Sequence, residues 1–135
     1  MKAAAIDLGT NAFRCLIRNI DSNYDTDIKI RYFVGLGKFL DKNNKLNLPA
    51  IYYSALDNIF NVISQNCVKK IHIVGTSVFR DSVNRNEILL DFKNRYKQEL
   101  NIIDPKTEAQ LTSLGVNTLF TNPDSDKIIV DIGGG

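Results

Sequence analysis

The sequence predicts an α/β domain that begins with three antiparallel strands and continues with alternating helices and strands. Within the first 34 residues, three short apolar or alternating runs are separated by polar turns, which is typical of β-hairpins. From residue 49 onward, apolar residues recur every three or four positions, as they do on one face of a helix. Short apolar runs separate these helical stretches, so the expected order of elements is βββαβαβα.

Three strands are expected in the first third of the chain. Residues Lys2–Leu8 form an almost continuous apolar run, which indicates a strand covered on both faces. The tight link Gly9-Thr10-Asn11 joins it to a second strand at residues 12–20, where apolar and polar side chains alternate. The same alternation predicts a third strand at residues 28–34. These three strands should form an antiparallel meander.

The middle of the chain predicts two helices with a short strand between them. Pro49 suits the first turn of a helix of about 17 residues. The apolar run Ile71–Val74 indicates a short buried strand, and Asn84 and Glu87 have the spacing of a capping box at the start of the second helix. Apolar residues at helical spacing are expected to form the inward faces, namely Tyr52, Ala55, Leu56, Ile59, Phe60 and Ile63 in the first helix, and Ile88, Leu89, Phe92 and Tyr96 in the second.

The last third predicts one more strand and one more helix. Asn101–Ile103 has the composition of a short strand. Asp104 and Pro105 combine a helix N-cap with a first-turn proline, so a helix should run from here to about Phe120. Its inward face is expected to consist of Leu111, Leu114 and Leu119.

A polar break at residues 121–126 separates this unit from a final strand that is expected at residues 127–132. The order of elements before the break is that of a ribonuclease-H-like domain with a mixed sheet. We therefore expect a first domain at residues 1–122. Residues 123–135 should be the linker, first strand and phosphate loop of a second domain that is cut short.

Two strand ends carry the same pattern of an acid followed by glycine. Residues 5–11 contain Asp7 and Gly9, and residues 130–135 contain Asp131 and three glycines. Glycine lets backbone N–H groups approach an anion closely, and a carboxylate can hold a divalent cation or position water. Taken singly, an acid before a glycine is more often a turn former, but two such loops predict a phosphate site. The second loop ends the sequence, so we expect only part of that site in these residues.

Composition narrows the classes of partner. The formal net charge is +2 and there is no polybasic block, so no nucleic-acid partner is expected. No apolar run approaches the roughly 20 residues that span a bilayer, so we expect no membrane association and a cytoplasmic location. Cys15 and Cys67 lack metal or redox spacing and are expected to be free, small core residues. His72 lies in an apolar run without partner ligands, which favours a core or edge histidine over a metal ligand.

Five short blocks follow one another along the chain: Ala4–Arg14, Gly35–Gly37 with Leu46 and Pro49 after it, Gly75–Arg80, Pro105–Leu111 and Asp131–Gly135. Together they resemble the exopolyphosphatase/guanosine-pentaphosphate phosphohydrolase (Ppx/GppA) family, within the actin-like ATPase superfamily of sugar kinases, Hsp70 and actin. The sequence departs from the family pattern at Ala12, where serine is common, and at Gln110, where arginine is usual. These departures bear on substrate preference more than on reaction class.

The resemblance implies that water removes a terminal phosphate from inorganic polyphosphate or guanosine pentaphosphate. It implies that Glu108 accepts the proton of the attacking water, and that Asp131 and Asp7 hold Mg2+ or Mn2+. The phosphate-binding residues that it implies are Gly9, Thr10, Asn11, Arg14, Arg80, Gly133, Gly134 and Gly135. Without the resemblance, Glu108 is explained by the helix dipole and Arg80 by a surface ion pair with Asp81.

Other interpretations stay open at this point. An ATP-binding, kinase-type member of the superfamily would contain similar loops, and a non-catalytic nucleotide or alarmone-binding module would lack turnover. Arg14 also fits a solvated strand face. If the natural chain continues, residues 1–135 should fold as an N-terminal domain with little activity. Residues 127–135 would then pack as an added edge strand or pair with another chain. Pairing with a second copy of the chain would give a homodimer.

Overall fold

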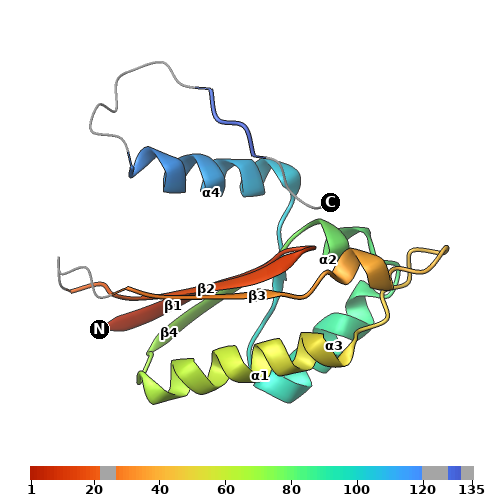
Figure 1. The fold of residues 1–135 in the computed structure, drawn as a ribbon, viewed down its shortest axis with the longest axis horizontal. Helices are drawn as coiled ribbons and strands as arrows, with labels where there is room; N and C mark the ends of the chain where they lie inside the picture. Colours follow the sequence, from red (N-terminus) through yellow and green to blue (C-terminus); the bar gives the residue numbers. More distant parts are fainter. Residues whose placement is uncertain (22–26, 120–127, 132–135) are drawn as a thin grey trace.

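The computed structural model describes residues 1–21, 27–119 and 128–131. Within these residues, five strands form one mixed sheet in the order β3-β2-β1-β4-β5 (Figure 1). Strand β1 pairs antiparallel with β2 and parallel with β4, β2 pairs antiparallel with β3, and β4 pairs parallel with β5. The strands are β1 (Lys2–Leu8), β2 (Ala12–Asn19), β3 (Ile28–Phe33), β4 (Lys70–Gly75) and β5 (Asn101–Ile102). The mixed sheet, its antiparallel meander and the ribonuclease-H-like class are confirmed.

The meander buries one of its two faces. Leu8 and Phe13 pair across the loop between β1 and β2, and both are fully buried. Ala5 in β1 is exposed, so the prediction that this strand is covered on both faces is wrong for the described residues. The run of alanines in β1 is apolar in composition, but small side chains do not by themselves show that a second layer covers them.

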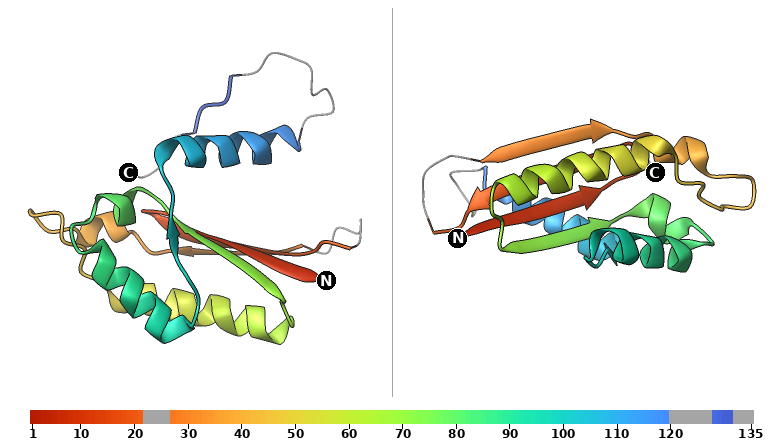
Figure 2. Two further views of the ribbon diagram at one scale, coloured as in Figure 1. Left: turned by 180° about the vertical axis from the view of Figure 1, so that it is seen from behind. Right: turned by 90° about the horizontal axis from the view of Figure 1, so that it is seen from below.

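Two long helices pack on the buried face of the sheet, α1 (Ala50–Gln65) and α3 (Arg85–Tyr96) (Figure 2). Tyr52 of α1 meets the ring of Phe13 edge-on with centroids 5.7 Å apart. The helices follow the predicted periodicity, because Tyr52, Ala55, Leu56, Ile59, Ile63, Ile88 and Phe92 are all buried. Phe60, Leu89 and Tyr96 are partly buried against this core.

Two short helices that the sequence did not predict lie before and after α1 in the chain. A 3-10 helix, η1 (Leu36–Phe39), follows β3, and α2 (Ser77–Asp81) follows β4. The predicted capping box of α3 is wrong in its hydrogen bonds. Asn84 is the N-cap residue, but its side chain donates to the Leu46 carbonyl at 3.0 Å and accepts from the Leu46 N–H at 2.9 Å. Asn84 therefore anchors the loop after η1 instead of capping its own helix.

Helix α4 (Pro105–Asn117) lies on the opposite side of the sheet from α1 and α3 (Figure 1). The helix begins as predicted and ends at Asn117 rather than near Phe120. The prediction that Leu111, Leu114 and Leu119 point inward is wrong, since all three are exposed. The sheet face on this side carries mainly small and charged residues, including Ala5, Lys29 and Arg31, and few bulky apolar ones such as Leu16 and Phe33. The leucines therefore have no continuous apolar layer there to pack against.

Residues 128–131 are not part of a strand, and Ile128 is 94% exposed, so the final strand is not found in its described part; residues 127 and 132 lie outside the described residues. Strand β4 is longer than predicted and half-buried. His72 is exposed on it, beyond the two residues that pair with β5, which makes it an edge histidine.

Both cysteines are free, as predicted, but only Cys15 belongs to the core. Burial raises the pKa of the Cys15 thiol to about 11, so it stays protonated at neutral pH. Cys67 is exposed where the chain turns after α1, with a φ of 54°, so its predicted place in the core is wrong. None of the described helices has the length and apolar composition to cross a bilayer.

Candidate phosphate site

The carboxyl ends of β1, β4 and β5 meet at one edge of the sheet because these three strands are parallel. A cavity of about 510 Å³ opens there, between this edge and α4. Seven of the eleven predicted site residues line it, namely Asp7, Gly9, Thr10, Asn11, Arg14, Glu108 and Asp131. Arg80 does not line the cavity, and Gly133, Gly134 and Gly135 lie outside the described residues.

Backbone hydrogen bonds fix the first glycine loop. The Gly9 N–H donates to the Ala12 carbonyl at 3.1 Å, and the Thr10 carbonyl accepts from the Leu36 N–H at 2.7 Å. A Cβ on Gly9 would lie 3.0 Å from the Ala12 carbonyl oxygen, a contact that neither backbone segment can easily relieve. Close backbone approach therefore favours glycine at this turn.

A second loop reaches the cavity from the end of β4. Thr76 and Ser77 both line the cavity, and the Ser77 hydroxyl lies 2.8 Å from the Thr10 hydroxyl. This contact between the Thr10 and Ser77 hydroxyls joins the two loops. Thr10 and Thr76 are buried. Neither Thr76 nor Ser77 was predicted as a site residue. The signal was present, because residues that follow parallel strands lie at the same sheet edge.

Asp7 and Arg14 face each other across β1 and β2. They are register partners, and the Arg14 guanidinium donates from Nη1 to Asp7 Oδ2 at 3.2 Å. Arg14 is in turn the register partner of Arg31 on β3, so a row of charged groups crosses the open face of the sheet. Arg14 is more than half exposed and retains guanidinium donors for an anion.

Arg80 connects α2 with the start of α4. Its Nη1 donates to the Ile103 carbonyl at 2.8 Å and to Glu108 Oε2 at 3.3 Å, whereas its Nε lies 3.9 Å from Asp81. The side chain is largely buried. Arg80 thus contacts the carboxylate of Glu108, and of the two residues only Glu108 lines the cavity.

The N-cap of α4 is formed as predicted. The Asp104 carboxylate accepts from the Thr107 N–H at 2.9 Å and from the Thr107 hydroxyl at 2.7 Å. These two donors, the N–H first, lower the pKa of Asp104 below its ordinary value. Because Glu108 is one residue past Thr107, this cap fixes the turn that presents Glu108 to the cavity.

Asp131 reaches the cavity from the far end of the described chain. Its Oδ2 accepts from the Thr112 hydroxyl of α4 at 3.4 Å, and the residue is otherwise exposed. This contact brings Asp131 beside α4, on the same cavity as the first loop. The described residues contain no group of three His, Cys, Asp or Glu side chains placed to hold a metal.

Sequence reasoning also missed Arg31 and Phe33, which line the cavity from β3. The Arg31 guanidinium lies 4.4 Å from the centroid of the Phe33 ring. Alternation along β3 does indicate that both side chains point away from the core, but it does not indicate that this face forms a cavity wall.

The fold and the site together define an actin-like, ribonuclease-H-like domain with a cavity at the carboxyl ends of its parallel strands. The chain belongs to the Ppx/GppA phosphatase family, whose model matches residues 27–135.

Two named relatives support this membership. A Haemophilus influenzae protein provisionally named an exopolyphosphatase is 31% identical over 138 residues, which cover 98% of this chain and 42% of the relative. A Vibrio atlanticus protein named guanosine-5'-triphosphate,3'-diphosphate pyrophosphatase is 32% identical over 134 residues, which cover 97% of this chain and 27% of the relative. The chain therefore spans less than half the length of these relatives.

Solved structures agree with the fold. An exopolyphosphatase-like protein has a TM-score of 0.80 and 27% identity, over 91% of this chain and 38% of its own. An exopolyphosphatase from Cytophaga hutchinsonii has a TM-score of 0.75 and 25% identity, over 87% of this chain and 39% of its own. The Ppx/GppA family member of Aquifex aeolicus has a TM-score of 0.75 at 24% identity, over 86% of this chain and 39% of its own.

Proposed function

We propose that this chain supplies one wall of an active site that releases the terminal phosphate of a phosphoanhydride to water. The substrates would be inorganic polyphosphate or guanosine pentaphosphate, which correspond to the activities named for the relatives from Haemophilus influenzae and Vibrio atlanticus. The observation that carries the proposal is the single cavity shared by the first glycine loop, Glu108 and Asp131. Phosphoryl transfer to water needs a positioned nucleophile and charge stabilisation, and this cavity contains groups for both.

Glu108 would act as the general base. As the water oxygen bonds to the terminal phosphorus and the bridging P–O bond breaks, the carboxylate would accept a proton from that water. Two contacts support this role of Glu108. The Asp104 cap fixes the first turn of α4, and Arg80 contacts the Glu108 carboxylate at 3.3 Å. A carboxylate held in this way can direct water toward a phosphate bound at the glycine loop.

Phosphate oxygens would be bound by Gly9, Thr10 and Asn11 of the first loop and by the Arg14 guanidinium. Gly133, Gly134 and Gly135 would bind them from the second loop. For Arg80, a phosphate role stays a prediction. Its bonds to Ile103 and Glu108 support a positioning role, because a guanidinium that already holds a carbonyl and a carboxylate offers fewer donors to substrate.

A divalent cation, Mg2+ or Mn2+, fits the carboxylates of this cavity in part. Mg2+ is commonly held by one or two carboxylates together with substrate phosphates, so the lack of a three-acid cluster in the described residues is compatible with it. Asp131 is the better candidate because its described partner is only the Thr112 hydroxyl, whereas Asp7 is paired with Arg14. The ion would neutralise charge on the phosphate oxygens, and Asp7 would reach it through water.

The test is phosphate release by the Glu108→Gln variant of the native protein that contains this sequence. Glutamine preserves the shape of the side chain but cannot accept the proton, so turnover should fall by about 100-fold or more while substrate affinity changes little. The matched control is Glu87→Gln, since Glu87 occupies the first turn of α3 and does not line the cavity. Wild-type turnover in Glu108→Gln would refute the proposed base.

A further inference from the structure

Phe33 is an aromatic side chain on the wall of the cavity that no predicted role explains. It is 68% exposed at the end of the edge strand β3, although it is large and apolar. Its ring contacts the Arg31 guanidinium at 4.4 Å, and no other aromatic ring among the described residues packs on it. Arg31 lies over one face of this ring, and an exposed aromatic and guanidinium surface beside a cavity is a typical surface for stacking a ligand.

We propose that Phe33 and Arg31 form a stacking platform for the purine base of a nucleoside polyphosphate. The proposal rests on the proposed function, because it needs phosphates bound at the first glycine loop. It identifies Phe33 as a residue that determines specificity. Inorganic polyphosphate has no apolar or π surface, so it gains nothing from an aromatic face, whereas a purine stacks on it.

The position of the platform relative to the glycine loop fits such a ligand. Phe33 is the register partner of Ala12, which directly follows the loop, and the N–H of the next residue, Val34, donates to the Asn11 carbonyl at 2.9 Å. Phosphates at Asn11 and a base on Phe33 would therefore occupy neighbouring parts of one cavity.

The Arg31 guanidinium makes the ring a better platform. Cation–π contact holds the arginine over Phe33, and a guanidinium plane can itself stack on a base or bind a phosphate. Arg31 is also the register partner of Arg14, which lies beside Asp7 in the cavity. Base stacking and phosphate binding thus meet at adjacent residues of the same sheet face.

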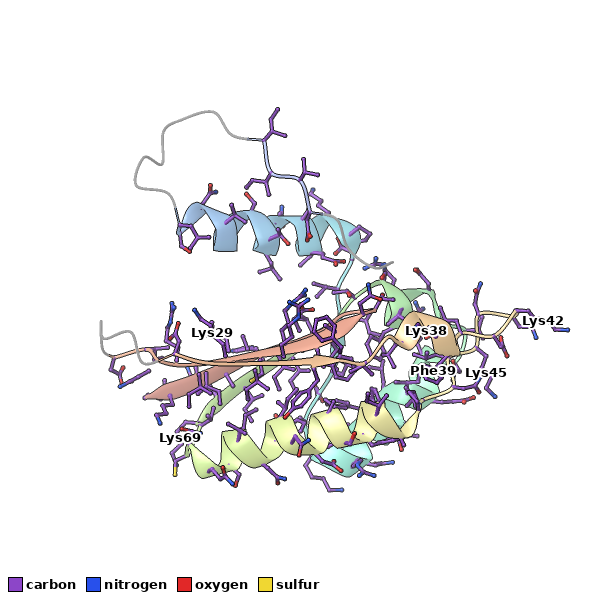
Figure 3. All side chains as sticks on the ribbon, in the orientation of Figure 1. Lys29, Lys38, Phe39, Lys42, Lys45 and Lys69 are labelled. Atoms are coloured by element: carbon purple, nitrogen blue, oxygen red, sulfur yellow. The ribbon has the colours of Figure 1, made fainter. Side chains whose placement is uncertain are left out.

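A second exposed aromatic provides a matched control. Phe39 ends η1 and lies near Lys38, Lys42 and Lys45, at the end of the molecule where the loop after η1 projects (Figure 3). Phe39 is partly exposed but does not line the cavity. Its removal should therefore leave ligand binding at the cavity unchanged.

The experiment compares three ligands that share a triphosphate: GTP, ATP and inorganic tripolyphosphate. Calorimetric titration would use the native protein in the Glu108→Gln background, so that ligand is not consumed. Phe33→Ala should weaken GTP and ATP binding by about tenfold and tripolyphosphate binding by less than about twofold. Phe33→Tyr should restore nucleotide affinity, and Phe39→Ala should alter none of the three.

The outcomes separate this inference from the proposed function. A loss for GTP alone or for both nucleotides supports the platform, and the difference reports which base it prefers. An equal loss for all three ligands would overturn it, because Phe33 would then act only by holding Arg31 against phosphate; an unchanged affinity would overturn it as well. A background protein, with Phe33 intact, that binds none of the three would refute the phosphate site itself.

Discussion

Tyr52 illustrates how a single residue is constrained in this core. Its side chain is fully buried between Phe13 and Phe79, yet its hydroxyl has no hydrogen-bond partner among the described residues. Burial raises the pKa of this phenol well above its ordinary value, so it stays neutral. A buried hydroxyl without a partner opposes folding.

We therefore expect Tyr52→Phe to raise the free energy of unfolding by about 1 kcal/mol, as measured by urea denaturation. The ring and its edge-on contact with Phe13 are preserved, and only the unpaired hydroxyl is lost. Tyr53→Phe is the control, since its hydroxyl already bonds Asp91 at 3.2 Å and its removal should not stabilise the protein. A clear destabilisation by Tyr52→Phe would show that its hydroxyl has a partner in solution.

Gly9 lies at a turn where the backbone approaches itself closely. A methyl group on Gly9 would press on the Ala12 carbonyl at 3.0 Å, so Gly9→Ala should displace the loop and weaken tripolyphosphate binding by about tenfold. Gly115→Ala is the matched control. No atom lies within 4 Å of its added Cβ, and alanine favours the helix, so binding should persist and α4 should become more stable. Unchanged binding in Gly9→Ala would refute the role of the loop.

Among the helices and strands, α4 should have a stability that depends on pH, because Asp104 is its N-cap residue. The folded-state pKa of Asp104 is lowered by the Thr107 donors, so its contribution to stability is present above the ordinary aspartate pKa of about 3.9 and is lost as the pH falls below it. Asp104→Ala should lower the thermal midpoint at neutral pH. The difference from wild type should shrink as the pH drops through about 4, and a pH-independent difference would contradict this account.

The sequence predicted the element types well because periodicity is a local property. Alternation on β2 and β3 and three-to-four spacing on α1 lead directly to the observed strands and helix. The same spacing on α4 shows that Leu111 and Leu114 share a face, but not that anything covers that face. Likewise, the sequence indicates that Asn84 occupies an N-cap position. It does not show that the side-chain amide of Asn84 forms hydrogen bonds with the backbone of Leu46.

The parts of the candidate site that depend on a glycine turn or on a helix cap could be predicted from the sequence. Gly9 and Asp104 both follow from local backbone requirements, and both occupy the expected positions. Phe33 and Ser77 were not predictable in this way. Their place in the cavity depends on strand order and register, which bring distant segments together.

For the whole molecule, the chain covers 42% and 27% of the two relatives compared. We propose that residues 1–122 are a first domain and that residues 123–135 begin a second one. If the native chain continues past residue 135, residues 1–135 alone should release phosphate at least about 100-fold more slowly than the longer form. Comparable turnover of the two, measured as phosphate release from polyphosphate, would contradict the proposed domain division.

The loops after β1 and β4 and the start of α4 should together form a single phosphate site. Titration of this chain with inorganic tripolyphosphate, followed by amide chemical shifts, is the measurement that tests this. We predict that Gly9, Thr10, Asn11, Ser77 and Glu108 shift together with one dissociation constant. Shifts confined to Lys38 of η1 and to Lys42 and Lys45 of the loop after it, with none at the glycine loop, would show that the phosphate binds elsewhere (Figure 3).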